Sequence, residues 1–238
     1  MYKTIYLIPF LFLACQSSEN GDSEIISENL TEQLDTPDES ETADTSVPMD
    51  LGLRKVKAVD LPDLDYAGNF NDCWYWEDKN GENYFIRTLE EPQLHPENSE
   101  GWETTDQYLH VYHYIVSSNA ESSLLRDLTD FVKDCEFDLI LYHLDEIELS
   151  DIDNDNYGEI TFGYRLNCTS DVSPSDQKVL LYENGDKYIL RGTAEAIGYG
   201  GEYEVGDEFD SAPEGFLKKA ESFWEENRVE FELEDNEF

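Results

Sequence analysis

Basic residues are scarce in this sequence: 15 Lys and Arg stand against 56 Asp and Glu in 238 residues, so the formal net charge is −41. Nucleic-acid binding requires a basic surface that neutralises phosphates and releases counterions, so this composition excludes that class of protein. Direct docking onto an anionic membrane surface is excluded for the same electrostatic reason. Aromatic residues are plentiful at 13%, which predicts that part of the chain folds.

Motifs of familiar enzyme classes are also lacking. The sequence has no GxSxG, P-loop, GxGxxG or HExxH pattern, and no CxxC pair for zinc or thiol redox chemistry. His110 and His113, three apart on a predicted strand, would point to opposite faces and make a poor metal pair. We expect a non-enzymatic protein; the alternative is a carbohydrate-active hydrolase or transferase that uses two of the many carboxylates.

Long hydrophobic runs are absent, and the longest apolar segment lies at the start of the chain. Lys3 precedes the apolar run Ile5 to Leu13, which ends at Ala14 and Cys15. The run is shorter than the ~20 residues of a membrane span and has the layout of a secretory signal. A small residue before Cys in this position resembles the lipobox of bacterial lipoproteins, which implies acylation of Cys15, for example with palmitate. An ordinary cleaved signal and an uncleaved helix are the alternatives.

The segment 16–50 has 11 acids and neither a basic nor an aromatic residue. Such a segment buries too little apolar surface to offset its chain entropy, so it is predicted to be a disordered acidic linker. Gln16 follows the Cys where Asp would signal inner-membrane retention of a lipoprotein. We therefore expect an outer-membrane lipoprotein, tethered by its lipid and facing the periplasm or the cell surface. Residues 51–238 carry a net charge of −31 and suit one domain.

The pattern of residues 51–238 predicts an α+β domain on a mainly antiparallel sheet. Asn-Gly pairs at 80–81 and 184–185 lie between alternating segments and predict two hairpins. Further strands are expected at 108–116, 138–143, 146–149 and 159–166. Two amphipathic helices are also expected. The first has one apolar face, formed by Leu124, Leu128, Phe131, Val132 and Cys135. The second begins with a capping box at 211–214 and has another, formed by Phe216, Ala220, Phe223 and Trp224.

Three cysteines remain once Cys15 is assigned to lipid. Cys135 at the end of the first predicted helix and Cys168 after a strand are expected to form a disulfide, as an exported compartment permits. Cys73 would then be a buried thiol. The alternative is three unpaired, buried cysteines.

The run DIDNDNYGE at 151–159 is a candidate metal-binding loop. The carboxylates of Asp151, Asp153, Asp155 and Glu159, with the backbone carbonyl of Tyr157, provide the oxygen ligands that Ca²⁺ prefers. The loop resembles the calcium loops of integrin-type β-hairpins more than an EF-hand. Because close carboxylates repel one another without a cation, we expect a structural calcium ion. The alternative is a solvated acidic turn in an acid-rich protein.

Aromatic side chains suggest a second kind of site. Trp74, Trp76 and Tyr112 could form a flat platform on which the apolar face of a sugar stacks. Ordinary packing in the core or at a sheet edge is the alternative.

Three stretches, 133–139, 151–168 and 170–192, carry a resemblance to a known family. Their most distinctive pieces are SDVSP and the K-Y-x-x-R-G ending at Gly192. Together they resemble small flavobacterial (Bacteroidetes) lipoproteins named for surface polysaccharide biosynthesis. The resemblance implies a role in the cell envelope, with surface glycans or envelope proteins as partners, and it assigns no catalytic residue.

Overall fold

The computed structural model describes residues 51–97 and 101–231. The predictions for the signal segment 1–15, for acylation of Cys15 and for the linker 16–50 lie outside these ranges. Within them, no helix combines the length and the apolar composition that crossing a membrane requires.

Six strands form the first of two large sheets, and neighbouring strands are antiparallel. They are β1 (Arg54–Val56), β2 (Asn69–Asp78), β3 (Gly81–Leu89), β4 (Gln93–His95), β5 (Thr104–Val116) and β6 (Ser122–Cys135). Their order is β1-β2-β3-β5-β4, and β6 pairs with β5. The long β5 therefore lies between β3 and β6.

Five strands form the second sheet, which is also antiparallel, in the order β13-β10-β9-β8-β7. They are β7 (Asp138–Ser150), β8 (Glu159–Thr169), β9 (Asp176–Glu183), β10 (Asp186–Thr193) and β13 (Tyr203–Val205). A small third sheet joins β11 (Glu195–Ala196), β12 (Tyr199–Gly200) and β14 (Val229–Phe231), and β11 and β14 are parallel. The predicted antiparallel architecture is confirmed.

Both predicted hairpins are present. Asn184 and Gly185 connect β9 to β10 with φ angles of 42° and 91°, the left-handed conformation that Asn and Gly adopt at low cost. Lys79 and Asn80 connect β2 to β3, and Gly81 opens β3 with φ 111°. A hydrogen bond of 3.0 Å from Asn80 Nδ2 to Asn184 Oδ1 links the two turns, so the tips of the hairpins meet.

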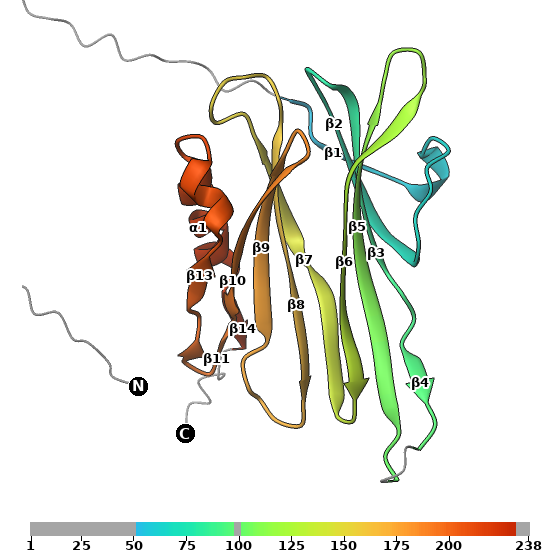
Figure 1. The fold of residues 1–238 in the computed structure, drawn as a ribbon, viewed down its shortest axis with the longest axis vertical. Helices are drawn as coiled ribbons and strands as arrows, with labels where there is room; N and C mark the ends of the chain where they lie inside the picture. The colour runs from blue at the N-terminus through green and yellow to red at the C-terminus, as the bar shows by residue number, and fades with distance from the viewer. Residues whose placement is uncertain (1–50, 98–100, 232–238) are drawn as a thin grey trace, which may run out of the picture. The chain divides into compact units, whose positions relative to one another are not determined.

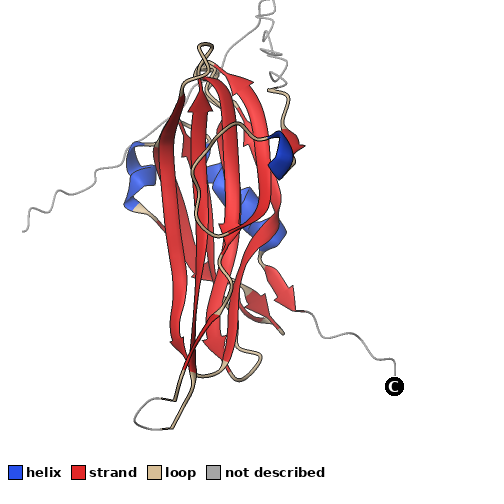
Figure 2. Ribbon diagram, turned by 90° about the vertical axis from the view of Figure 1, so that its right-hand side faces the viewer, coloured by secondary structure: helices blue, strands red, loops and turns tan. Residues whose placement is uncertain are grey.

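The two large sheets pack face to face as a β-sandwich, and the axes of their long strands are roughly aligned (Figures 1 and 2). Aromatic rings from both sheets fill the interior: Phe85 of the first lies 4.8 Å from Phe162 of the second, and Phe162 lies 5.0 Å from Tyr182. Trp76 is fully buried in the same cluster. Alternation along each strand sends one set of apolar side chains into this core.

One α-helix, α1 (Phe216–Asn227), covers the other face of the second sheet (Figure 1). The second predicted helix is confirmed, because Phe216, Ala220, Phe223 and Trp224 are fully buried against β9 and β10. Its predicted capping box is wrong: the helix begins after Gly215, whose φ is 99°, and no side chain caps it. The residues at 207–211 instead form a 3₁₀ helix, η2 (Asp207–Ser211); a shorter one, η1 (Ala58–Asp60), follows β1.

The first predicted helix is wrong, because its residues form β6. Two register shifts explain the error: the pairing of β6 with β5 slips once near Leu125 and again near Asp134, whose φ is 50°. A β-bulge inserts a residue and reverses the side-chain alternation beyond it. Leu128, Val132 and Cys135 therefore all contact the core although they are spaced as on a helix, whereas Leu124 is exposed.

The predicted disulfide is present: Cys135 at the end of β6 is bonded to Cys168 in β8. The sequence analysis expected this disulfide to link a helix to a sheet, but it links the two large sheets. Cys73 is buried with a free thiol, as predicted.

Candidate metal centre

The acidic loop connects β7 to β8 and is held by its own side chains. Asn154 and Asn156 have φ angles of 60° and 71°, so asparagine supplies the left-handed turns where glycine is usual. Asp155 N donates to Asp153 Oδ1 at 3.2 Å, and Asn156 N donates to Asp151 Oδ1 at 3.3 Å. These bonds turn the aspartate carboxylates toward the loop's own backbone.

Three of the predicted ligands converge. Asp151, Asp153 and Glu159 each place a carboxylate oxygen within 4.8 Å of the others. Glu159 is fully buried, and both of its oxygens accept a hydrogen bond from Ile152 N at 3.0 Å. The loop therefore forms a group of side chains able to hold a metal ion.

A fourth predicted ligand, Asp155, belongs to a second group that includes a residue missed by the sequence analysis. Asp153, Asp155 and Glu183 place carboxylate oxygens within 4.8 Å of one another, so Asp153 is shared by both groups. Glu183 ends β9 on the neighbouring strand, where Tyr182 pairs with Ile160. Antiparallel pairing of the segments 159–166 and 176–183 was the sequence signal that would have placed Glu183 beside Glu159.

Glu183 is the most informative member of the site. Its side chain is 8% exposed, and Oε1 has no hydrogen-bond partner among the described residues. Burial first, and the charge of neighbouring carboxylates second, raise the pKa of Glu183 to about 8 and that of Glu159 to about 7. A cation would remove the cost of ionising these groups.

Tyr157, the fifth predicted ligand, has a second role in the loop. Its backbone N–H donates to Asp155 Oδ1 at 2.8 Å, and its half-buried ring lies beneath Lys79 with Nζ 4.3 Å from the ring centre. Lys79 N also donates to Asn156 O at 2.8 Å. The turn of the β2–β3 hairpin therefore supports the acidic loop from the opposite sheet.

The predicted sugar-stacking platform is wrong. Trp76 is fully buried in the core, and Trp74 packs partly buried against the same cluster. Tyr112 lies on the opposite face of the first sheet, where its hydroxyl accepts a hydrogen bond from Ala67 N at 3.1 Å. Strand alternation separates the rings, and burial removes Trp76 from any ligand.

The two histidines point to opposite faces of β5, as predicted. His113 is buried with Nε2 2.9 Å from Asn83 Oδ1, and its ring lies 5.1 Å from that of Trp76. His110 lies with Nδ1 2.8 Å from Thr129 Oγ1 and Nε2 3.1 Å from Glu90 Oε1. Both histidines serve as hydrogen-bonding groups of the sheet.

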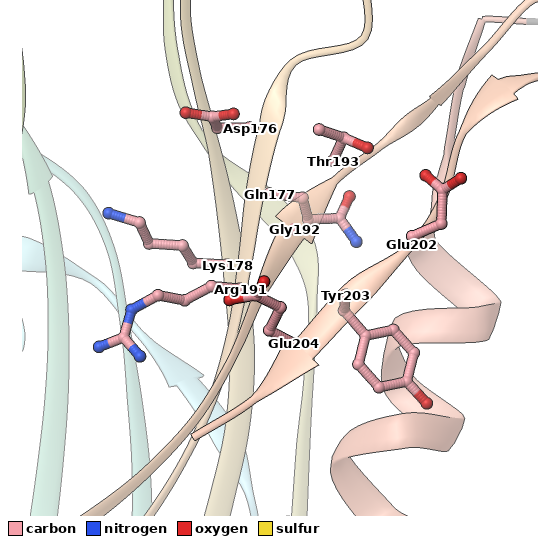
Figure 3. A pocket seen from close by; sticks show the side chains of 9 residues that line it. All are labelled: Asp176, Gln177, Lys178, Arg191, Gly192, Thr193, Glu202, Tyr203 and Glu204. Atoms are coloured by element: carbon pink, nitrogen blue, oxygen red, sulfur yellow. The ribbon is translucent and has the colours of Figure 1, made fainter. Parts of the chain in front are cut away.

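A cavity of about 460 Å³ lies where β9 begins and β10 ends, beside β13. Asp176, Glu202, Glu204 and Tyr203 contribute to its lining, together with Lys178 and Arg191. Figure 3 shows Lys178 and Arg191 extending to one side of β10 and Tyr203 to the side of the helix. Charges of both signs therefore line this region.

No family model, curated protein or solved structure matches the chain.

Proposed function

We propose that this chain is an exported, lipid-anchored cell-envelope protein, stabilised by calcium, with a non-enzymatic accessory or binding role in surface polysaccharide biosynthesis or display. The observation that carries the ion site is the presence of two groups of three carboxylates that share Asp153, the second of which includes the buried Glu183 with one oxygen unpartnered among the described residues.

Calcium is the cation that suits these ligands. All the side-chain donors are carboxylate oxygens, the hard ligands of Ca²⁺, which accepts irregular arrangements of six to eight oxygens. Mg²⁺ demands a near-octahedral set and keeps several waters, so a crowded set of carboxylates favours the larger ion. The ion would link the β7–β8 loop to the end of β9 and would act structurally.

Export and anchoring are supported by the N-terminal segment and by the disulfide. The small residue and Cys15 after a short apolar run resemble a lipobox, and the disulfide between Cys135 and Cys168 suits an oxidising compartment. The polysaccharide role rests on the family resemblance in the second half of the folded part.

A carbohydrate-active hydrolase is the second candidate. The cavity beside β13 favours it, because Asp176, Glu202 and Glu204 line the same space as Tyr203. The carboxyl groups with strongly raised pKa values, Glu159 and Glu183, belong to the two carboxylate groups at the acidic loop and the end of β9, and not to this cavity. These two carboxyl groups are therefore placed to hold a cation and are not placed to act as the general acid on a sugar bound in that cavity.

The test is thermal unfolding of the full chain in detergent, in millimolar calcium and in chelator. We expect calcium to raise the melting temperature of the wild type. Glu183→Gln should melt at a higher temperature than wild type in chelator, because it removes a carboxyl that must either be protonated or be buried as a charge on folding, and it should lose most of the response to calcium.

Glu214→Gln is the matched control, since Glu214 is exposed and lies before α1. It should keep the wild-type response. Identical wild-type melting curves in calcium and in chelator would overturn the ion site. Hydrolysis of a glycan that is abolished by Glu204→Gln would favour the second candidate.

A further inference from the structure

The inner face of β10 lies at an edge of the sandwich. Alternation sends Tyr188 and Leu190 of this strand toward α1 and sends Ile189 into the sandwich core. Lys187 and Arg191 share the face of Ile189. On β9 the same rule places Lys178 on the inner face, beside Leu180 and Tyr182.

Strand β6, to which only β5 pairs in the first sheet, forms the opposite wall. A cavity of about 280 Å³ opens between β6 and the inner face of β8, β9 and β10. We call this cavity the basic groove, after the four cationic side chains that line it. They are Arg126, Lys178, Lys187 and Arg191.

The charge of the groove is opposite to that of the molecule. Residues 51–238 hold 14 Lys and Arg against 45 acids, and four of those 14 line this one cavity. Lys178 forms an ion pair with Asp130, and Arg126 donates to Gly185 O. Among the described residues, Lys187 and Arg191 form no ion pair with a carboxylate, which leaves two cations facing the groove.

Hydrogen-bonding groups of the groove point to a ligand that also carries hydroxyls. Tyr182 is fully buried, lines the cavity, and its hydroxyl has no hydrogen-bond partner. Asp130 adds a carboxylate to the same lining, where it accepts a hydrogen bond from the Tyr164 hydroxyl and pairs with Lys178. Sugar hydroxyls can donate to the Asp130 carboxylate and pair with the Tyr182 hydroxyl, whereas a fully ionised sulfate has no hydrogen to donate.

We propose that the basic groove binds a carboxylate-bearing saccharide, with its carboxylate between Lys187 and Arg191 and its hydroxyls toward Asp130 and Tyr182. The bidentate fork of Arg191 matches a carboxylate, and Lys187 adds a point charge. The acidic surface around the groove would repel a long polyanion, so a short or sparsely charged glycan suits it best. The choice of a saccharide deepens the proposed polysaccharide role and rests on it.

The experiment is calorimetric titration of the full chain in detergent with a glucuronate trisaccharide and with the same trisaccharide methyl-esterified at its carboxyls. We expect the acid to bind and the neutral ester to bind at least about tenfold more weakly. The double variant Lys187→Ala/Arg191→Ala should weaken binding of the acid by a similar factor. Running each titration in calcium and in chelator separates failure of the groove from failure of the ion site.

The matched control is Lys57→Ala/Lys218→Ala, which removes the same charge from two exposed positions. It should bind as wild type does, and equal loss in both double variants would overturn the groove. Equal binding of acid and ester, or no binding at millimolar ligand, would do so as well. Competition by inorganic phosphate as strong as that of the trisaccharide would overturn a saccharide ligand. Binding of neutral glycans alone would keep the polysaccharide role and overturn the groove.

Discussion

Burial sets the protonation of several side chains inside the sandwich. His113 is 1% exposed, and burial lowers its pKa from 6.5 to about 4 despite the nearby charge of Asp78. In the unfolded chain the same imidazole takes up a proton near its ordinary pKa. Between these two pKa values the unfolded state binds more protons, so the neutral His113 stabilises the fold fully above pH 6.5 and loses that contribution as the pH falls toward 4.

We therefore expect His113→Gln to change the pH dependence of unfolding. The variant loses packing against Trp76 at every pH, but its deficit relative to wild type should shrink by up to about 1.4 kcal/mol for each pH unit as the pH falls from 6.5 to 4. Urea unfolding at several pH values measures the difference. A deficit that is constant with pH would contradict the prediction, and His95→Gln, at a partly exposed histidine that lies 3.2 Å from Asp106, should not reproduce this change.

Glu159 and Glu183 titrate in the opposite sense in the absence of a metal ion. Because the folded pKa values of Glu159 and Glu183 are raised, the folded state binds more protons than the unfolded state between the ordinary glutamate pKa of 4.5 and about 7 to 8. These two groups make the metal-free fold less stable as the pH rises through that window. The pH dependence of unfolding of His113→Gln and of Glu183→Gln, each compared with that of wild type, measures the contributions of the histidine and the glutamate separately.

At the scale of elements, the disulfide connects the end of β6 in the first sheet to β8 in the second across 33 residues of sequence. Closing a loop of this length in the unfolded chain stabilises the fold by about 3–4 kcal/mol in the chain-entropy model. The double variant Cys135→Ser/Cys168→Ser should lower the free energy of unfolding by that amount, measured in urea. Reduction of the wild type should have the same effect, and an unchanged midpoint after reduction would contradict it.

Local signals predicted the elements that depend on local chemistry. The Asn184–Gly185 turn needs only two residues that tolerate positive φ, and α1 needs only one apolar face. The prediction for the residues of β6 was wrong because the bulges near Leu125 and Asp134 depend on the pairing of this strand with β5. Glu183 was missed because its neighbour Glu159 lies 24 positions earlier and only strand register brings the two together.

Charge dominates the behaviour of the whole molecule. With 56 acids against 15 bases, most surface charges repel one another, and this self-repulsion destabilises the compact state. We expect added sodium chloride to raise the melting temperature, since ~0.1 M salt shortens the range of repulsion to ~10 Å. Glu183→Gln should keep this response to salt although it loses the response to calcium. A melting temperature that falls with added salt would contradict the prediction.

One hydrogen bond in the core has a practical consequence. Trp76 Nε1 donates to Asp78 Oδ2 at 2.9 Å, and the same oxygen accepts Gly158 N of the acidic loop at 3.0 Å. The indole of a fully buried tryptophan is thus joined through one oxygen atom to the residue preceding Glu159. We therefore expect the emission of Trp76 to change if an ion binds to the loop, so that titration of the wild type with calcium or a lanthanide would test the site by fluorescence.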